Sequence, residues 1–188
     1  MLLSALLAAL DAGAVPASDC VGPDPEVMRV VHDSRSVEPG DLFCCITGAH
    51  HDGHDHVEQA VGAGAVAVLA EHPMASDAPV VVAESVRQTM PLLAAAVVGN
   101  PSHDLRVVGV TGTNGKTSVA HMLAGVLDSL GRRSEAIGTL SGIRTTPEAP
   151  EFQRCLAAWS REGVECVVAE VSSHALAQHR VDGTRFFG

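Results

Sequence analysis

The sequence has few aromatic residues and only one lysine. Phe, Trp and Tyr together make up 3% of its 188 residues and Tyr is absent, whereas 46% of the residues are hydrophobic. A core must therefore be built from Ala, Val and Leu, which suits Val-rich parallel strands covered by Ala-rich helices. The formal net charge of −10 argues against a general nucleic-acid or acidic-membrane surface. No apolar run is long enough to span a membrane.

Cysteine and basic residues carry further information. The five cysteines are an odd number without C-x-x-C spacing, so we expect reduced thiols in a cytoplasmic protein. Eleven of the twelve basic residues are Arg, and Lys116 is the single lysine. A compact ammonium on a flexible stem reaches phosphate oxygens where a planar guanidinium would not fit.

The first ten residues read "MLLSALLAAL" and have two interpretations. They resemble the apolar core of a signal peptide, but no Lys or Arg precedes them and Asp11 ends the run early. We therefore expect an ordinary first helix over residues 1–12.

Apolar runs and breakers alternate along the chain and predict an α/β fold with parallel sheets. Strands are expected at 27–32, 41–47, 65–71, 79–85, 105–111, 135–139 and 165–171, and helices at 1–12, 56–63, 86–98, 116–130 and 148–162. The breakers Gly99, Asn100 and Pro101 place a domain boundary between 1–102 and 103–188. The second domain has about three strands and enters a fourth at "RFFG", so we expect it to be incomplete.

The stretch "LRVVGVTGTNGKTS" (105–118) predicts a phosphate-binding loop. A Val-rich strand leads to Gly112 and Gly115, and Lys116 and Thr117 then open a helix whose N-terminus favours phosphate. Lys116 can bridge phosphates and the Thr117 hydroxyl can bind Mg²⁺. Val110 replaces the glycine of the usual fingerprint, so the strand should run further and the loop begin later. A dinucleotide site using Glu135, or an ordinary strand–turn–helix corner, remains an alternative.

A nucleotide-phosphate site needs an acid at the end of a neighbouring strand to hold Mg²⁺. Glu170 ends the apolar run of "ECVVAEVSSH", and we expect it in this role, the alternative being a solvent-facing acid. The same stretch continues with Ser172, Ser173 and His174 at the carboxyl end of the strand, where ligands bind in open α/β sheets. His174 is expected to support the site indirectly or to be structural, and not to be a ligand.

The segment "HHDGHDH" (50–56) suggests a zinc site because His and Asp alternate closely in it. Its spacing lacks a clear scheme of three ligands with an open position, and Asp with Gly is typical of a loop that enters a helix. We expect such a loop.

Five stretches resemble motifs of the Mur ligases in the family's order: "HDSRSVEPGDLF", "DGHDHVEQAVGAGAVAVLAE", "VTGTNGKTS", "TTPEAPEFQ" and "AEVSSHALAQHRVDG". They look most like the MurE type, which adds the third residue to UDP-N-acetylmuramoyl-L-alanyl-D-glutamate in peptidoglycan precursor synthesis. The resemblance implies an N-terminal α/β UDP-binding domain and the opening part of a central P-loop ATPase domain with a parallel sheet, the C-terminal domain being absent. It also implies a cytoplasmic ATP-dependent acid–amino-acid ligase that uses ATP and Mg²⁺, without nucleic-acid partners or stable membrane insertion.

Site residues follow from the resemblance position by position. The ATP loop would comprise Gly112, Thr113, Asn114, Gly115, Lys116, Thr117 and Ser118, with Lys116 as the catalytic residue on the phosphates. Thr117 and Glu170 would hold the metal. Ser34 and residues 49–51 match contacts to the uridine end, and the muramoyl-dipeptide contacts match Thr145, Thr146, Ser172, Gln178 and Arg180. Position 144 departs from the pattern, because Arg144 stands where the family often has Asn, and the segment before it is short.

The chemistry that the resemblance implies is carboxylate activation. ATP phosphorylates the D-glutamyl side-chain carboxylate, and an amino group displaces phosphate from the acyl phosphate through a tetrahedral intermediate. A downstream His and a carbamylated Lys would lie beyond residue 188, so we expect this polypeptide alone not to complete the ligation. Two alternatives remain: another ligase of the superfamily, such as a folylpolyglutamate synthase or a MurF-like enzyme, and a non-catalytic nucleotide-binding module. The added amino acid, diaminopimelate or lysine, is left open.

Overall fold

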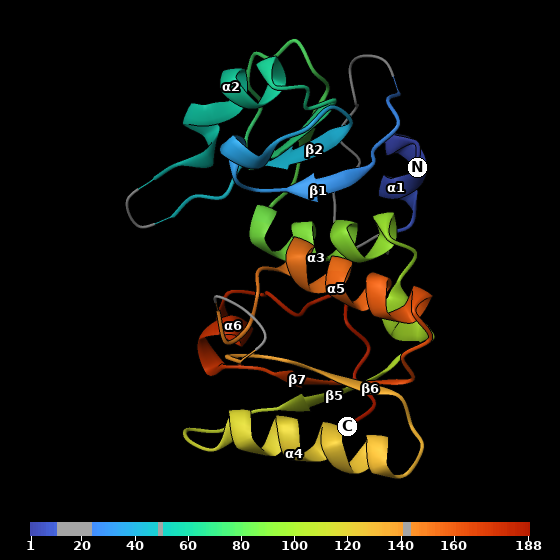
Figure 1. The fold of residues 1–188 in the computed structure, drawn as a ribbon. Helices are drawn as coiled ribbons and strands as arrows, with labels where there is room; N and C mark the ends of the chain where they lie inside the picture. The colour runs from blue at the N-terminus through green and yellow to red at the C-terminus, as the bar shows by residue number, and fades with distance from the viewer. Residues whose placement is uncertain (11–23, 49–50, 141–143) are drawn as a thin grey trace. The chain divides into compact units, whose positions relative to one another are not determined.

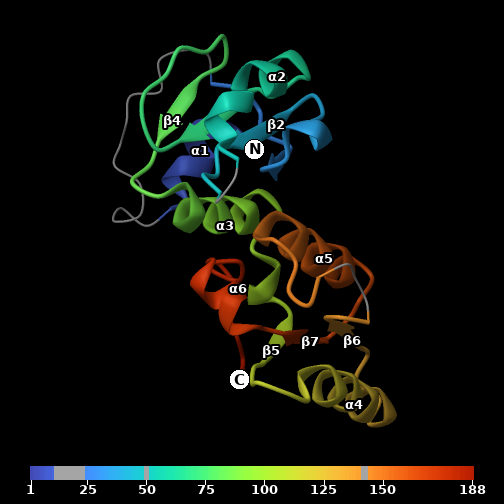
Figure 2. The same cartoon turned by 90° about the vertical axis from the view of Figure 1, so that its left-hand side faces the viewer.

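The computed structural model describes residues 1–10, 24–48, 51–140 and 144–188 (Figures 1 and 2). Their backbone forms two compact units, Met1–Val97 and Val98–Gly188. The expected boundary after residue 102 falls inside a short 3-10 helix, η3 (Pro101–His103), which belongs to the second unit. No helix in the described ranges is long and apolar enough to cross a membrane.

The first unit is built on a parallel sheet of four strands in the order β1-β2-β3-β4. The strands are β1 (Arg29–Val31), β2 (Asp41–Cys44), β3 (Ala67–Ala70) and β4 (Val80–Val82). The other elements are α1 (Leu3–Ala8), η1 (Ser34–Ser36), η2 (Gly53–His56), α2 (Val57–Gly62) and α3 (Val86–Val97). The expected strands and helices are confirmed, and most of them are shorter than the apolar runs that predicted them.

The first helix is part of the core of this unit. Leu3 and Leu6 on α1 are buried, and α1 packs against α3. The backbone around it is fixed by two hydrogen bonds, from the Leu3 N–H to the Pro25 carbonyl at 2.9 Å and from the Val27 N–H to the Met1 carbonyl at 2.7 Å. The helix expected at the N-terminus is thus confirmed over Leu3–Ala8, while residues 11–12 lie outside the described ones.

The second unit has a three-stranded parallel sheet in the order β5-β7-β6. Its strands are β5 (Arg106–Val110), β6 (Ser134–Ile137) and β7 (Cys166–Glu170), and its helices are α4 (Lys116–Ser129), α5 (Ala149–Arg161) and α6 (Ser173–Ala177). Figure 1 shows α4 on one face of the sheet and α5 on the other. The buried side chains agree: Ala120 and Ala124 of α4 pack with Val168, whereas Phe152 and Leu156 of α5 pack with Val167.

Two features of this unit differ from expectation. Helix α6 was not predicted, because its five residues carry too little periodicity to be recognised. The last residues were expected to enter a fourth strand, and they pair with β5 only through an isolated parallel bridge between Phe186 and Val107. The Phe187 N–H donates to the Val107 carbonyl at 2.7 Å, so the chain end does lie along the edge of β5.

Candidate active site

The loop between β5 and α4 owes its shape to two glycines. Gly112 has φ +146° and Gly115 has φ +80°, a region that residues with a Cβ rarely adopt. A Cβ on Gly115 would meet nothing within 4 Å, so the backbone conformation, and not the available space, requires glycine there. Val110 ends β5 and pairs with Glu170, so the strand does run through the position where the usual fingerprint has glycine.

Lys116 closes the loop from its helical side. Its Nζ donates to the Gly112 carbonyl oxygen at 2.7 Å, and the loop residues 111–115 are exposed. The first N–H groups of the fourteen-residue helix α4 have no intrahelical acceptor, and the helix dipole is positive at that end. An ammonium, free amides and an open loop together form a surface for an anion such as phosphate.

Glu170 is a buried acid that lies directly beside this loop. It is only 1% exposed, and its Oε2 accepts a hydrogen bond from Thr117 Oγ1 at 2.9 Å. Its Oε1 accepts one from the Thr139 N–H at 2.9 Å. The alternative of a solvent-facing acid is therefore wrong. A carboxylate and a hydroxyl in contact are the hard oxygen donors that Mg²⁺ prefers, so these two residues fit the metal.

Gly138 and Thr139 adjoin the Glu170 carboxylate and were not predicted from the sequence. A Cβ on Gly138 would lie 2.0 Å from Glu170 Oε1 and 2.4 Å from its Cδ, so only glycine leaves room for the carboxylate. Thr139 contributes its N–H and, at 3.4 Å, its hydroxyl to the same carboxylate. The available signal was their position at the end of the strand expected at 135–139, which the structure ends at Ile137, because the carboxyl ends of parallel strands meet at one edge of the sheet.

The dinucleotide alternative does not agree with where Glu135 lies. A dinucleotide site needs its acid at the carboxyl end of the second strand, and Glu135 is the second residue of β6, with an exposed side chain.

Three of the five residues expected to contact the dipeptide are joined by hydrogen bonds around the end of β7. Thr146 is buried, donates its hydroxyl to the Glu170 carbonyl at 2.8 Å and accepts from the Ser172 N–H at 3.2 Å. Ser172 Oγ caps α6 by accepting from the Ala175 N–H at 3.1 Å. Arg180 Nη1 donates to the Thr146 carbonyl at 3.1 Å.

Thr145 and Gln178 complete this set. Thr145 Oγ1 is 3.1 Å from Thr139 Oγ1, which links it to the surroundings of Glu170. Gln178 is the C-cap residue of α6, where its N–H donates to the His174 carbonyl at 3.0 Å. His174 lies within α6, and its side chain is exposed.

Ser34, expected at the uridine end of the substrate, lies in the first unit and opens η1. Its Oγ donates to Gln59 Oε1 at 3.1 Å. Residues 49 and 50 of the segment expected to act with it lie outside the described residues.

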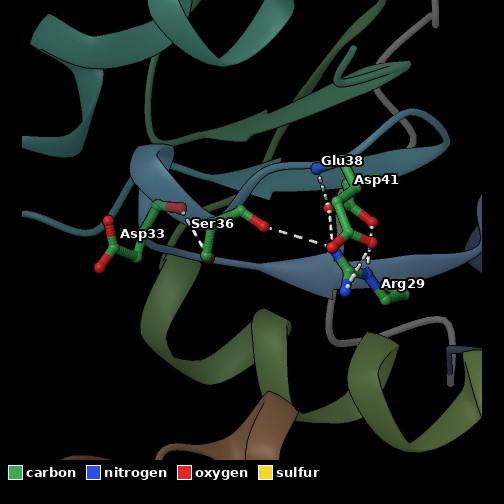
Figure 3. Close-up of polar contacts among 5 residues, drawn as sticks. All are labelled: Arg29, Asp33, Ser36, Glu38 and Asp41. Atoms are coloured by element: carbon green, nitrogen blue, oxygen red, sulfur yellow. Dashed lines mark hydrogen bonds and ion pairs between the residues drawn. The ribbon is translucent and has the colours of Figure 1, made fainter. Parts of the chain in front are cut away.

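A buried carboxylate fixes the loop that carries Ser34 (Figure 3). Asp41 begins β2 and accepts from Arg29 Nε at 2.8 Å and Nη2 at 2.7 Å. It also accepts from the Glu38 N–H at 2.8 Å, and Ser36 donates its hydroxyl to the Asp33 carbonyl at 2.9 Å. The motif "DSRSVEPGD" is therefore a loop between β1 and β2, and hydrogen bonds of Asp41 to Arg29 and to Glu38 hold it in place.

Asp33 precedes Ser34 and caps η1 with its side chain. Hydrogen bonds from the Arg35 side chain, against a smaller desolvation cost, lower the pKa of the Asp33 carboxyl from 3.8 to about 2. This carboxylate stays ionised at every physiological pH and holds Arg35 beside Ser34.

The histidine-rich segment supports its own loop. His54 Nδ1 lies 2.6 Å from Asp52 Oδ1, and its Nε2 accepts from the Glu71 N–H at 3.2 Å. The His54 ring also stacks on His72 with centroids 4.4 Å apart. Both ring nitrogens of His54 thus have partners within the protein. The residues that the structure describes contain no group of three His, Cys, Asp or Glu placed to hold a metal, and His50 lies outside them.

Comparison with known proteins gives matches over most of the chain. The family model "Mur ligase family, catalytic domain" matches residues 26–106, and "Mur ligase middle domain" matches residues 110–187. The UDP-N-acetylmuramoyl-L-alanyl-D-glutamate–2,6-diaminopimelate ligase of Geobacillus thermodenitrificans is 45% identical over 171 residues, and that of Streptomyces avermitilis is 44% identical over 177. These matches cover 86% and 87% of this chain but 35% of each relative.

Solved structures agree with the sequence comparison. A structure of a UDP-N-acetylmuramoyl-L-alanyl-D-glutamate–2,6-diaminopimelate ligase matches with a TM-score of 0.78 and 28% identity, over 91% of this chain and 37% of that one. The MurF ligase of Thermotoga maritima in complex with ADP matches with a TM-score of 0.64 and 28% identity, over 85% of this chain and 36% of that one. The loop, the acid beside it and these matches agree, and the chain belongs to the Mur ligase family.

Proposed function

We propose that this chain carries the UDP-substrate-binding and ATP-binding parts of a MurE-type ligase, an ATP-dependent acid–amino-acid ligase of peptidoglycan precursor synthesis. The observation that carries the proposal is the contact of Thr117 with Glu170 beside a glycine loop closed by Lys116. The chain spans 35% of the length of its curated relatives, which are named as ligases acting on UDP-N-acetylmuramoyl-L-alanyl-D-glutamate.

ATP is proposed to bind at the loop from Gly112 to Ser118. Lys116 would exchange its contact with the Gly112 carbonyl for the terminal phosphates, and the free amides of α4 would receive phosphate oxygens. Thr117 and Glu170 would hold Mg²⁺, which neutralises phosphate charge when bound. The Thermotoga maritima relative was solved in complex with ADP, which supports an adenine nucleotide as a ligand of this chain.

The UDP-linked precursor is proposed to contact both parts of the chain. Ser34 and the 49–51 segment, within residues 1–102, would take the uridine end. The dipeptide would be contacted by residues within 103–188, namely Thr145, Thr146, Ser172, Gln178 and Arg180. Thr146 bonds to the backbone of the acid that would hold the metal, and Ser172 and Arg180 bond to Thr146, which suits a substrate whose carboxylate must meet ATP.

The proposed reaction has two displacements. A D-glutamyl side-chain carboxylate oxygen attacks the γ-phosphorus of ATP, and ADP leaves. The amine nitrogen of the incoming amino acid attacks the acyl carbon, which forms a tetrahedral intermediate, and inorganic phosphate leaves as the amine loses its proton. The chain's own residues bind and orient, and Lys116 balances negative charge on the transferred group. We place this reaction in the cytoplasm.

Isothermal titration calorimetry tests the proposal on the 188-residue chain. We expect binding of ATP with Mg²⁺ and of UDP-N-acetylmuramoyl-L-alanyl-D-glutamate, and a loss of ATP affinity of about a hundredfold in Lys116→Ala, because one charge-assisted phosphate contact contributes roughly 1.5–3 kcal/mol. Arg132→Ala removes a surface positive charge beyond the other end of α4 as the matched control and should leave ATP binding intact. Unchanged ATP affinity in Lys116→Ala would overturn the loop assignment.

A further inference from the structure

The His54 ring joins the segments that follow two neighbouring strands of the first unit. His54 lies in η2, which comes after β2, and its side chain is only 7% exposed. Its Nδ1 lies 2.6 Å from Asp52 Oδ1, and its Nε2 accepts from the N–H of Glu71, the residue after β3, at 3.2 Å. Because β2 and β3 are parallel neighbours, both contacts lie at the carboxyl edge of the sheet, where open α/β sheets bind their ligands.

These two contacts depend differently on the protonation of the ring. A backbone N–H can only donate, so Nε2 must present a lone pair to Glu71, and the proton of the neutral ring is on Nδ1, which donates to Asp52. A second proton would bind to Nε2. The bond from Nδ1 to Asp52 exists in both states. The bond from the Glu71 N–H exists only in the neutral state, because after protonation two N–H groups would face each other.

The groups around the ring determine what protonation does. The Asp52 carboxylate compensates the added charge and keeps its bond to Nδ1. His72 stacks on His54 with ring centroids 4.4 Å apart, so two charged rings would repel each other. Burial, with a smaller effect from Asp52, raises the pKa of the Cys45 thiol to about 12, so this neighbour stays neutral. The other charged or titratable side chains of η2 and of the segments after β3 and β4 are exposed: Asp55, His56, Glu71, Asp77 and Glu84.

The contact between His54 and Glu71 is connected to both neighbouring helices. The segment η2 continues directly into α2, where Gln59 Oε1 accepts from Ser34 Oγ at 3.1 Å. Glu71 Oε1 accepts from the Val86 N–H at 3.2 Å, at the start of α3. Loss of the bond between His54 and Glu71 would therefore separate the α2 side of this edge, with Ser34, from the side that leads to α3.

We propose that His54 is a pH switch at the carboxyl edge of the first sheet. Neutral His54 holds η2 against the segment after β3, and its protonation releases Glu71 while Asp52 keeps the ring. Histidine ordinarily changes its charge between pH 5 and pH 8, so the contact opens as the pH falls through that range. Opening also lowers the affinity for the uridine end of the precursor, because Ser34 is held from α2. This effect on the ligand rests on the proposed function, whereas the opening itself does not.

Nuclear magnetic resonance of the backbone amides tests the switch on the 188-residue chain. As the pH is lowered from 7.5 to 5.5, we expect the Glu71 amide proton to move upfield together with the titration of the His54 ring, because it loses its acceptor. His54→Gln keeps an acceptor oxygen and cannot be protonated, so its Glu71 amide should not move. His56→Gln removes an exposed histidine of the same 3-10 helix as the matched control and should titrate like the unaltered chain. A Glu71 amide that does not follow the titration of His54 would overturn the switch.

Calorimetry at the same two pH values tests the effect on the ligand. The probe is UDP-N-acetylmuramoyl-L-alanyl-D-glutamate, whose diphosphate is esterified at both ends and does not titrate in this range. We expect its affinity to fall by about three- to tenfold at the lower pH, the equivalent of one lost hydrogen bond, in the unaltered chain and in His56→Gln. In His54→Gln it should fall by less than about twofold. An equal fall in all three chains would overturn the effect on the ligand.

The two measurements separate the possible failures. If His54→Gln does not fold by circular dichroism, the titration of the Glu71 amide in the unaltered chain still decides whether the switch exists. Failure of the unaltered chain to bind the probe at either pH would overturn the proposed function, and the resonance of Glu71 would decide the switch independently.

Discussion

Thr117 and Glu170 are 53 residues apart in the chain, and their side-chain oxygens lie 2.9 Å from each other. Thr117 is held by the start of α4 and Glu170 by the end of β7, two elements that pack together. Parallel pairing of Val110 with Glu170 fixes this contact, because it brings the end of β7 level with the start of the loop. The contact joins the glycine loop, proposed to bind phosphate, to the buried acid proposed to hold the metal.

Glu170→Gln should abolish most of the effect of Mg²⁺ on ATP binding. The substitution keeps the shape of the side chain and removes its charge, so ATP affinity without Mg²⁺ should change little. We expect the gain in affinity on adding Mg²⁺ to fall by about tenfold or more, measured by calorimetry with and without the ion. Glu165→Gln makes the same change just before the other end of β7 and should keep the full Mg²⁺ effect. A Glu170→Gln chain with an unaltered Mg²⁺ effect would show that the acid does not hold the metal.

Gly138→Ala should disturb the same carboxylate without touching any charged residue. The added Cβ would lie 2.0 Å from Glu170 Oε1, so the carboxylate must leave its hydrogen bonds with Thr139 and Thr117. We expect a loss in the free energy of unfolding of about 1–3 kcal/mol, the usual cost of unpairing a buried polar group, and a weaker Mg²⁺ effect.

Gly125→Ala is the control for that substitution. Gly125 lies within α4, and a Cβ there would meet nothing within 4 Å. Alanine should therefore stabilise the helix by roughly 0.5–1 kcal/mol in urea denaturation. Similar effects of the two substitutions would contradict the account of Gly138.

Asp41→Asn should weaken the first unit. Its carboxylate is buried and bonded to Arg29 through two atoms, and the amide would leave the guanidinium only partly paired. Breaking a fully buried ion pair costs roughly 3–5 kcal/mol in the free energy of unfolding. Because the Arg29 side chain is 31% exposed, we expect a smaller loss here, of about 2–3 kcal/mol. Urea denaturation followed by circular dichroism measures this, and the exposed Asp77→Asn should change stability by less than about 0.5 kcal/mol. Equal stability of both variants would refute the role of Asp41.

Asp33 should make stability depend on pH in the acid range. Its folded-state pKa is about 2, below the ordinary 3.8, because Arg35 hydrogen-bonds to the ionised form. A lowered pKa contributes stability above the ordinary value, and this contribution is lost as the pH falls from about 4 toward 2. Asp33→Asn should therefore show a smaller drop in Tm between pH 5 and pH 3 than the unaltered chain. A drop of the same size in both would mean that Arg35 does not hold the carboxylate.

Much of the second unit could be predicted from local sequence. The Val-rich run before Gly112, the Lys-Thr pair after Gly115 and the apolar run before Glu170 each indicate an element and its end. Residues without such a pattern were not found. Gly138 and Thr139 follow a short strand in an unremarkable stretch, and their role depends on which strands are neighbours in the sheet. The five-residue helix α6 is too short for periodicity to reveal it.

The sequence by itself determined the α/β class, the glycine loop with its displaced start and the position of Glu170 at the end of a strand, because these depend on strand patterning and on the chemistry of a few adjacent residues. Only the tertiary structure decided that Glu170 is buried against Gly138 and that Glu148 holds Arg144 and Arg180 together. The physical reason is that burial and charge compensation are properties of the packed molecule. A carboxylate in a sequence can face water or serve two guanidinium groups, and only the folded chain determines which.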